Sequence, residues 1–247
     1  MRFNNRSNNA IRPVKIIPDC LEFGDGSALI EMGKTKVIAA ATVEEKVPHF
    51  LKNCGKGWIT SEYSLLPCST TKRTARERIP GRISGRTQEI QRLIGRSLRA
   101  VTDLNIIGEK TIIIDCDVIQ ADGGTRAASI TAGCVALALV LKKMMDKKII
   151  DHMPLKHLAA AISVGIVDGE LLCDLDYAED SNAEIDMNVV ETDTGEIIEI
   201  QAAAEKTPFT KEKFDSLLEL ASNGIKELIM LQKEILKKKS LLFMAYR

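Results

Sequence analysis

The sequence has no net charge, no closely paired cysteines and no long hydrophobic run, and each absence narrows what the chain can be. Its 34 Lys and Arg residues balance 34 Asp and Glu residues, so any basic binding site must be local. Six cysteines without a Cys-x-x-Cys pair, together with only three histidines, argue against a zinc site and a disulfide framework. This cysteine usage is typical of a reducing compartment.

Neither a membrane span nor a secretory leader is predicted. The longest nearly apolar run, 132–141, is too short to cross a bilayer, and the polar first residues lack the apolar segment of a signal peptide. We therefore expect a cytoplasmic protein with no membrane partner. The 247 residues suffice for one large domain or two small ones. Because no low-complexity linker divides them, we expect one compact α/β unit.

Hydrophobic patterns predict strands in both halves of the chain, with helices between and after them. Residues 14–66 are rich in strand patterns, with a hairpin turn at Gly33-Lys34. Further strands are predicted at 159–167, 171–175, 185–190 and 196–203. Helices are predicted at 87–104, 127–141 and 211–237, of which the second is apolar on almost all sides and therefore buried.

A strand, a turn and a helix are predicted in direct succession near the middle of the chain. Isoleucines at 112–114 favour a buried strand, and Gly123-Gly124 ends it before the apolar helix. Glycines let a ligand approach the backbone, and a first helical turn offers unpaired N–H groups to an anion. Thr125 adds a hydroxyl, and Arg126 adds a planar fork suited to phosphate oxygens. A phosphate site is one interpretation, and a simple turn is the other.

Basic residues dominate the segment from 72 to 86, where Glu77 is the single acid. They are Lys72, Arg73, Arg76, Arg78, Arg82 and Arg86. Proline and glycine oppose regular structure here, so the segment is either a solvated loop or an arm that binds a polyanion, and the excess of basic residues favours the arm. The next predicted helix carries Arg92, Arg96 and Arg99 on a face away from its apolar stripe.

The densest acidic run, 174–186, leads into a predicted strand. Since Ile185 and Met187 must share one face of that strand, Asp186 points to the other. Asp180 and Asp186 can reach one point if the residues between them turn. Paired carboxylates suit Mg²⁺. An exposed acidic hairpin is the alternative, and acidity alone does not decide between the two.

Four segments of the chain are distinctive: GWITSEY at 57–63, GRTQEIQRLIGR at 85–96, IDCDVIQADGGTR at 114–126 and DYAEDSNAEIDMNVV at 176–190. Together they resemble the bacterial ribonuclease PH family, whose members are phosphate-dependent 3′→5′ exoribonucleases, also called tRNA nucleotidyltransferases. The resemblance covers nearly the whole chain. It implies an α/β (α+β) ribonuclease PH fold, of the ribosomal protein S5 domain 2-like type. It further implies two similar βα halves, at 10–141 and 158–224, and a hexameric ring built as a trimer of dimers.

The resemblance also implies roles for individual residues. Inorganic phosphate, the co-substrate, would be bound by Arg86, Gly124, Thr125 and Arg126. Asp180 and Asp186 would be catalytic and would hold a divalent metal, Mg²⁺. RNA would be bound by Arg73, Arg76, Arg92 and Arg96. Cys68 stands where the family pattern has an arginine, so the resemblance does not imply an RNA contact at this position.

The activity implied is trimming of the 3′ ends of tRNA precursors and other RNA. Phosphate is the nucleophile, so no activated Ser, Cys or His is needed, and the reaction should be reversible because a phosphodiester is exchanged for a phosphoanhydride. Two alternatives remain. A hydrolytic two-metal nuclease would act without phosphate, and a non-catalytic RNA-binding ring subunit would lack residues of the site.

Overall fold

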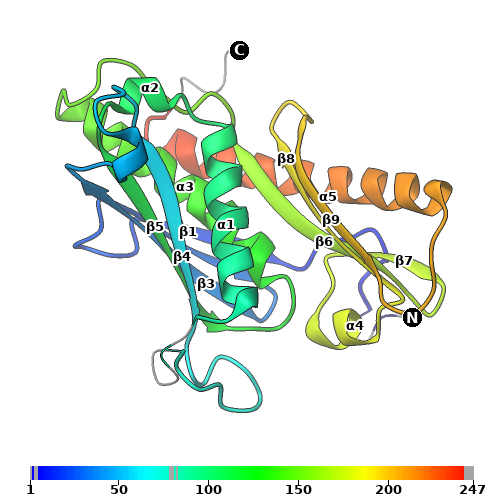
Figure 1. Ribbon diagram of the computed structural model, residues 1–247. Helices are drawn as coiled ribbons and strands as arrows, with labels where there is room; N and C mark the ends of the chain where they lie inside the picture. Colours follow the sequence, from blue (N-terminus) through cyan, green and yellow to red (C-terminus); the bar gives the residue numbers. More distant parts are fainter. Residues whose placement is uncertain (1, 3–4, 78–80, 82, 242–247) are drawn as a thin grey trace.

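The computed structural model describes residues 2, 5–77, 81 and 83–241, and there two β-sheets enclose a long helix (Figure 1). The strands are β1 (Val14–Pro18), β2 (Gly26–Met32), β3 (Thr35–Glu44), β4 (Trp58–Leu65), β5 (Thr111–Gln120), β6 (Ala159–Val167), β7 (Glu170–Cys173), β8 (Ile185–Thr192) and β9 (Ile197–Ala204). The helices are α1 (Gly85–Ala100), α2 (Leu104–Ile107), α3 (Thr125–Asp146), α4 (Tyr177–Asn182) and α5 (Lys211–Lys238), with a 3₁₀ turn at His49–Leu51.

The first sheet has the strand order β1-β2-β3-β5-β4, and only β4 and β5 among its neighbours run parallel. Parallel neighbours need a crossover connection, which α1 supplies by packing on β4. In β5, Ile112, Ile114 and Cys116 are buried on one face while Asp115 and Asp117 lie on the other. The strand predicted from the isoleucine run is therefore confirmed, and it delivers the chain to the turn before α3.

The second sheet has the order β7-β6-β8-β9 and is antiparallel throughout. Its strand β6 is buried along almost its whole length because α3 and α5 both pack against it. Helix α3 contacts both sheets and is buried on nearly all sides, as its apolar sequence predicts. By length and composition α3 could cross a membrane, but 83% of its apolar window is buried within the protein, so it is the core helix.

The predicted elements agree with the structure except at three places. Helix α3, predicted to end at 141, continues to Asp146. The helix predicted at 87–104 ends at Ala100, and α2 follows it, because Thr102 bridges to Leu155 and Asp103 caps a new helix. Helix α4 was not predicted, because its six residues carry no apolar stripe. The hairpin turn at Gly33-Lys34 joins β2 to β3 as predicted.

Candidate active site

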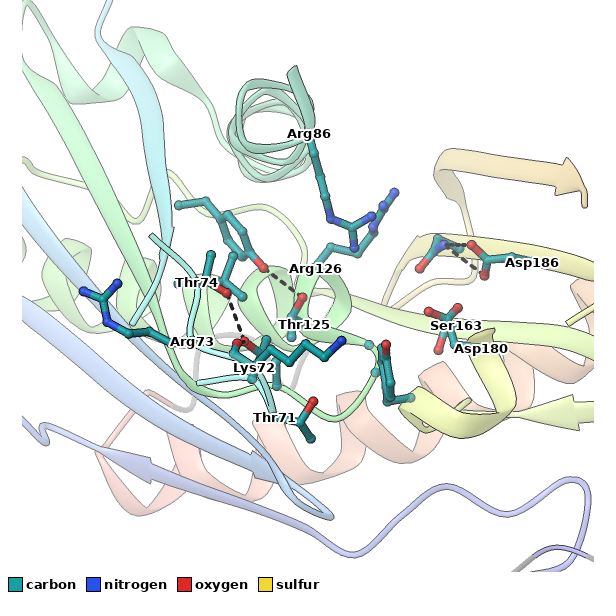
Figure 2. A pocket seen from close by; sticks show the side chains of 18 residues that line it. Thr71, Lys72, Arg73, Thr74, Arg86, Thr125, Arg126, Ser163, Asp180 and Asp186 are labelled. Carbon is teal, nitrogen blue, oxygen red and sulfur yellow. Dashed lines mark hydrogen bonds between the residues drawn. The ribbon is translucent and has the colours of Figure 1, made fainter. Parts of the chain in front are cut away.

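A cavity of about 660 Å³ opens where the two sheets meet, and it gathers most of the polar residues predicted for a site (Figure 2). Three groups of side chains line it. Segment 70–74 contributes hydroxyl and basic groups, the start of α3 contributes Thr125 and Arg126, and the opposite wall carries Asp180 and Asp186. The cavity therefore has a cationic end and an anionic end facing each other.

The cationic end is built on the turn before α3. Gly123 and Gly124 have φ values of +75° and +65°, which residues other than glycine rarely adopt. A Cβ on Gly123 would also come within 2.5 Å of the Leu175 carbonyl oxygen, so the turn can touch the chain before α4 only as glycine. Gly124 caps α3 without a side-chain hydrogen bond, which leaves the first N–H groups of the helix directed at the cavity.

Two arginines extend from different helices into this end of the cavity, as Figure 2 shows. Arg126 donates to Gln201 Oε1 at 2.6 Å and lies 3.3 Å from Glu89 Oε1, so its guanidinium is held in place. Arg86 is the second residue of α1, a helix capped by the Ser84 side chain. The Tyr63 hydroxyl and the Thr125 Oγ1 lie 2.8 Å apart and fix the threonine. An anion in the cavity would meet two cations and a helix N-terminus.

The anionic end consists of Asp180, on α4, and Asp186, on β8. Burial and the charge of Asp180 raise the pKa of Asp186 to about 6. Burial also raises the pKa of Asp180, and the charges of Arg86 and Arg126 partly offset this. Asn188 donates to both carboxylate oxygens of Asp186 at 3.3 and 3.4 Å. Two half-buried carboxylates that repel each other favour a shared cation.

The aspartate pair fits Mg²⁺ by its chemistry. Mg²⁺ is bound in proteins through one or two carboxylates plus substrate phosphates, and it keeps several waters. Among the described residues, no cluster of three or more His, Cys, Asp and Glu side chains is placed to hold a metal, so two carboxylates are the protein ligands on offer. A phosphate bound at the cationic end would complete such a set.

The structure separates the basic residues predicted to bind RNA. Arg73 lines the cavity, whereas Arg76, Arg92 and Arg96 are absent from its lining. Arg96 instead forms an ion pair with Glu199 on β9 at 2.9 Å. Arg78 and Arg82, part of the same basic segment, lie outside the described residues. The RNA-binding roles remain predictions.

Sequence reasoning did not place Tyr63, Ser163 or Tyr177 in the site, although all three line the cavity. Tyr63 belongs to the recognised segment 57–63, where strand alternation could have set its direction. The buried Ser163 hydroxyl has no hydrogen-bond partner among residues 2, 5–77, 81 and 83–241. No sequence signal marks Ser163, because its position depends on how the two sheets pack.

Comparisons with known proteins identify the family. The model of the 3′ exoribonuclease family, domain 1, matches residues 10–142, and that of domain 2 matches residues 157–224. Ribonuclease PH of Moorella thermoacetica is 57% identical over 96% of this chain and 94% of its own length. Ribonuclease PH of Syntrophomonas wolfei is 58% identical over 95% of this chain and 98% of its own.

The fold also has a solved counterpart. A chain of the Archaeoglobus fulgidus exosome, solved with RNA bound to the active site, superposes with a TM-score of 0.79 at 22% identity, over 92% of this chain and 91% of that one. At that identity the likeness concerns the fold alone, and it agrees with the ribonuclease PH fold expected from the sequence. On the family matches and the two relatives, this chain belongs to the ribonuclease PH family of 3′ exoribonucleases.

Proposed function

We propose that this phosphorolytic 3′→5′ exoribonuclease trims the 3′ ends of tRNA precursors with the help of Mg²⁺ and transfers each terminal nucleotide to inorganic phosphate. The observation that carries the proposal is the pairing of the two arginines and the glycine turn with two carboxylates across one cavity. A hydrolase has no use for a phosphate cradle, whereas phosphorolysis requires one next to the scissile bond.

The chain's own groups divide the work of this reaction. Arg86, Arg126 and the N–H groups of the turn hold inorganic phosphate, so that one of its oxygens faces the last phosphodiester of the RNA. Attack forms a phosphorus–oxygen bond to the terminal phosphorus and breaks the bond to the 3′ oxygen of the preceding nucleotide. The proton of the attacking hydrogen phosphate ends on the 3′ oxygen, so the shortened RNA leaves with a 3′ hydroxyl and a nucleoside diphosphate is released.

The carboxylates act at the other side of the reacting phosphorus. Asp180 and Asp186 would hold Mg²⁺, which when bound neutralises charge on the scissile phosphodiester. No protein nucleophile is required. The three buried cysteines agree with this, since burial raises the pKa of Cys134 and that of Cys173 each to about 12, and that of Cys116 also lies above its ordinary value. These thiols stay protonated at neutral pH.

The proposal also covers the oligomeric state of the protein and its location in the cell. We expect a hexameric ring, a trimer of dimers, whose similar halves span 10–141 and 158–224 of each chain, working in the cytoplasm. The exosome that the structural counterpart comes from is itself an assembly, which supports a search for oligomers. Light scattering on the purified protein would give the mass of the assembly, and a monomer would contradict the ring.

One experiment tests the reaction itself. A tRNA with a short 3′ extension is incubated with the protein and Mg²⁺, with and without inorganic phosphate, and the mononucleotide product is identified. We expect shortening only with phosphate and nucleoside diphosphates as products. Nucleoside monophosphates formed without phosphate would favour a hydrolytic nuclease, and binding without any shortening would favour a non-catalytic ring subunit.

Substitution of the arginines should weaken phosphate binding specifically. Arg126→Ala and Arg86→Ala each remove charge-assisted hydrogen bonds worth roughly 1.5–3 kcal/mol. The phosphate concentration for half-maximal rate should then rise by about one to two orders of magnitude. Arg126→Lys keeps the charge but loses the planar fork, so its half-maximal phosphate concentration should lie between those of wild type and Arg126→Ala. Lys36→Ala, which removes an exposed cation paired with Glu31, is the matched control. Unchanged phosphate dependence in both alanine variants would refute the phosphate site.

Arg73 and Arg76, both in the basic 72–86 segment, should differ in their effects, because Arg73 lines the cavity and Arg76 does not. Arg76→Ala should weaken binding of a tRNA precursor and lower the slope of log K against log salt by about 0.9 per lost phosphate contact. It should leave the rate on a short single-stranded oligonucleotide unchanged. Arg73→Ala should impair both substrates. Binding and rate are measured on both RNAs across a salt series. If Arg76→Ala impaired the tRNA precursor and the oligonucleotide equally, Arg76 would act on the active site itself.

A further inference from the structure

Tyr177 is an exposed aromatic residue inside the cavity. It is the first residue of α4, it lines the cavity, and 59% of it is exposed. The other exposed aromatic residues of the described part of the chain, Phe23 and Phe50, do not line the cavity, and the Phe50 ring packs edge-on against Trp58 with 5.3 Å between the ring centroids. Tyr63, the other aromatic residue of the cavity lining, is 3% exposed and already bound to Thr125. Among the aromatic residues that the structure describes, only Tyr177 both lines the cavity and has a ring open to a ligand.

The position of Tyr177 ties it to both ends of the site. A Cβ on Gly123 would lie 2.9 Å from the Tyr177 backbone nitrogen, so the residue begins directly beside the phosphate turn. Asp180 lies three residues further along α4, and residues three apart share a face of a helix. A nucleotide whose phosphate lies between the turn and the aspartates therefore has this ring within reach of its sugar and base.

No contact of the Tyr177 ring with another described residue explains its place. Within the described part of the chain, the Tyr177 hydroxyl makes no hydrogen bond, and its ring makes no aromatic or cation contact. Base faces are flat and apolar, and aromatic side chains bind them by stacking without regard to sequence. A nucleobase is thus the group in this enzyme's substrate that best matches an open tyrosine ring.

We propose that the Tyr177 ring stacks on the base of the 3′-terminal nucleotide and forms a nucleobase subsite next to the phosphate and metal sites. The inference rests on the proposed function, because the terminal phosphodiester must lie between the turn and the aspartates. Stacking does not distinguish between the bases, so the subsite can bind any terminal base and position its phosphodiester for attack by phosphate. It would also bind the base of a nucleoside diphosphate in the reverse reaction.

The test uses Tyr177→Leu, which removes the ring, and Tyr177→Phe, which keeps it. Both are assayed on a short RNA ending in adenosine and on the same RNA with an abasic 3′-terminal ribose. With adenosine, Tyr177→Leu should raise the KM for RNA roughly 5- to 150-fold, the range expected for loss of one stacked base. Tyr177→Phe should behave as wild type. On the abasic RNA all three proteins should have equal KM values.

Three results would overturn the subsite. They are an unchanged KM for Tyr177→Leu, an equal loss on the abasic RNA, and a loss in Tyr177→Phe as large as in Tyr177→Leu. The KM for inorganic phosphate, measured on the same proteins and on Arg126→Ala, separates this inference from the proposed function. Tyr177→Leu should leave the KM for phosphate unchanged, and Arg126→Ala should raise it. If Arg126→Ala does not raise the KM for phosphate, the proposed phosphate site is wrong, and this conclusion does not depend on the results for Tyr177.

Discussion

Asp186→Asn is expected to lower the rate of phosphorolysis roughly 10²- to 10³-fold, the usual cost of removing one group that stabilises charge in a transition state. Asparagine keeps the size of the side chain and its place beside Asn188, but it is a far weaker ligand for Mg²⁺. Asp180→Asn should have a similar effect. Because the carboxylates occupy a cavity wall, neither substitution should disturb the packing of β8 or α4.

The same substitution should leave the protein as stable as before, or more stable. Burial and the charge of Asp180 raise the pKa of Asp186 to about 6, so the folded state without metal disfavours the charged form. A raised carboxyl pKa means that stability falls as pH rises from the ordinary value of about 4 through 6. Asp186→Asn cannot ionise and so does not lose this stability. Its free energy of unfolding should therefore exceed that of metal-free wild type at pH 7 and equal it below pH ~4.

Thermal unfolding with and without Mg²⁺, alongside the phosphorolysis assay, checks both statements. Wild type should gain in Tm on addition of Mg²⁺, and Asp186→Asn should not. Asp168→Asn, in the exposed turn between β6 and β7, is the matched control and should keep full activity. A variant that unfolds at lower temperature would show that Asp186 serves the fold, and one with full activity would remove it from the mechanism.

Local signals made much of this site predictable. A run of three isoleucines and a pair of glycines identify β5 and the turn, because strand formation and positive φ are properties of a few neighbouring residues. Alternation in β8 likewise placed Asp186 on the face opposite Met187. Helix α4 was missed because it is short and polar, yet Asp176 and Glu179 form a capping box that the sequence shows in outline.

Contacts between distant segments could not be predicted in the same way. That Gly123 touches the chain before α4 depends on how the two sheets pack around α3, and no local pattern carries that information. The same holds for Arg73, which the basic segment brings into the cavity while Arg76 stays outside its lining. Arg12 is the clearest case, because its carboxylate partner, Asp174, lies 162 residues away.

Asp174→Asn is expected to destabilise the protein by about 3–5 kcal/mol, because it leaves buried arginines without their counter-charge. The Asp174 carboxylate is 1% exposed and accepts three hydrogen bonds from Arg12, through the backbone nitrogen at 2.7 Å, Nε at 2.9 Å and Nη2 at 2.7 Å. Arg6 donates a further bond at 3.2 Å. Asparagine tolerates the positive φ of 56° at this position, so backbone strain does not confuse the result.

The effect should depend on pH in a defined direction. Burial acts to raise the pKa of Asp174, but the hydrogen bonds and charge of Arg12 outweigh it and leave the pKa below its ordinary value. A lowered carboxyl pKa contributes stability above about pH 4 and loses it as pH falls further. The difference between wild type and Asp174→Asn should therefore be full at pH 7, where Tm falls by roughly 6–20 °C, and shrink in acid. Asp146→Asn, in an exposed pair with Lys142, should show no measurable change.

A double variant separates the fold from the site. Arg12 also donates to the carbonyl oxygens of Asp122 and Gly123, and these hydrogen bonds support the glycine turn before α3. Arg12→Met with Asp174→Asn removes both charges of the buried Arg12–Asp174 pair, while Arg6 keeps its ion pair with Glu179. Much of the lost stability should therefore return, because no unpaired charge of that pair stays buried. Phosphate affinity should not return with it, because the turn has lost its support. Recovery of both properties would mean that the pair only stabilises the fold, and recovery of neither would mean that Arg12 is needed for folding through its bonds to the turn.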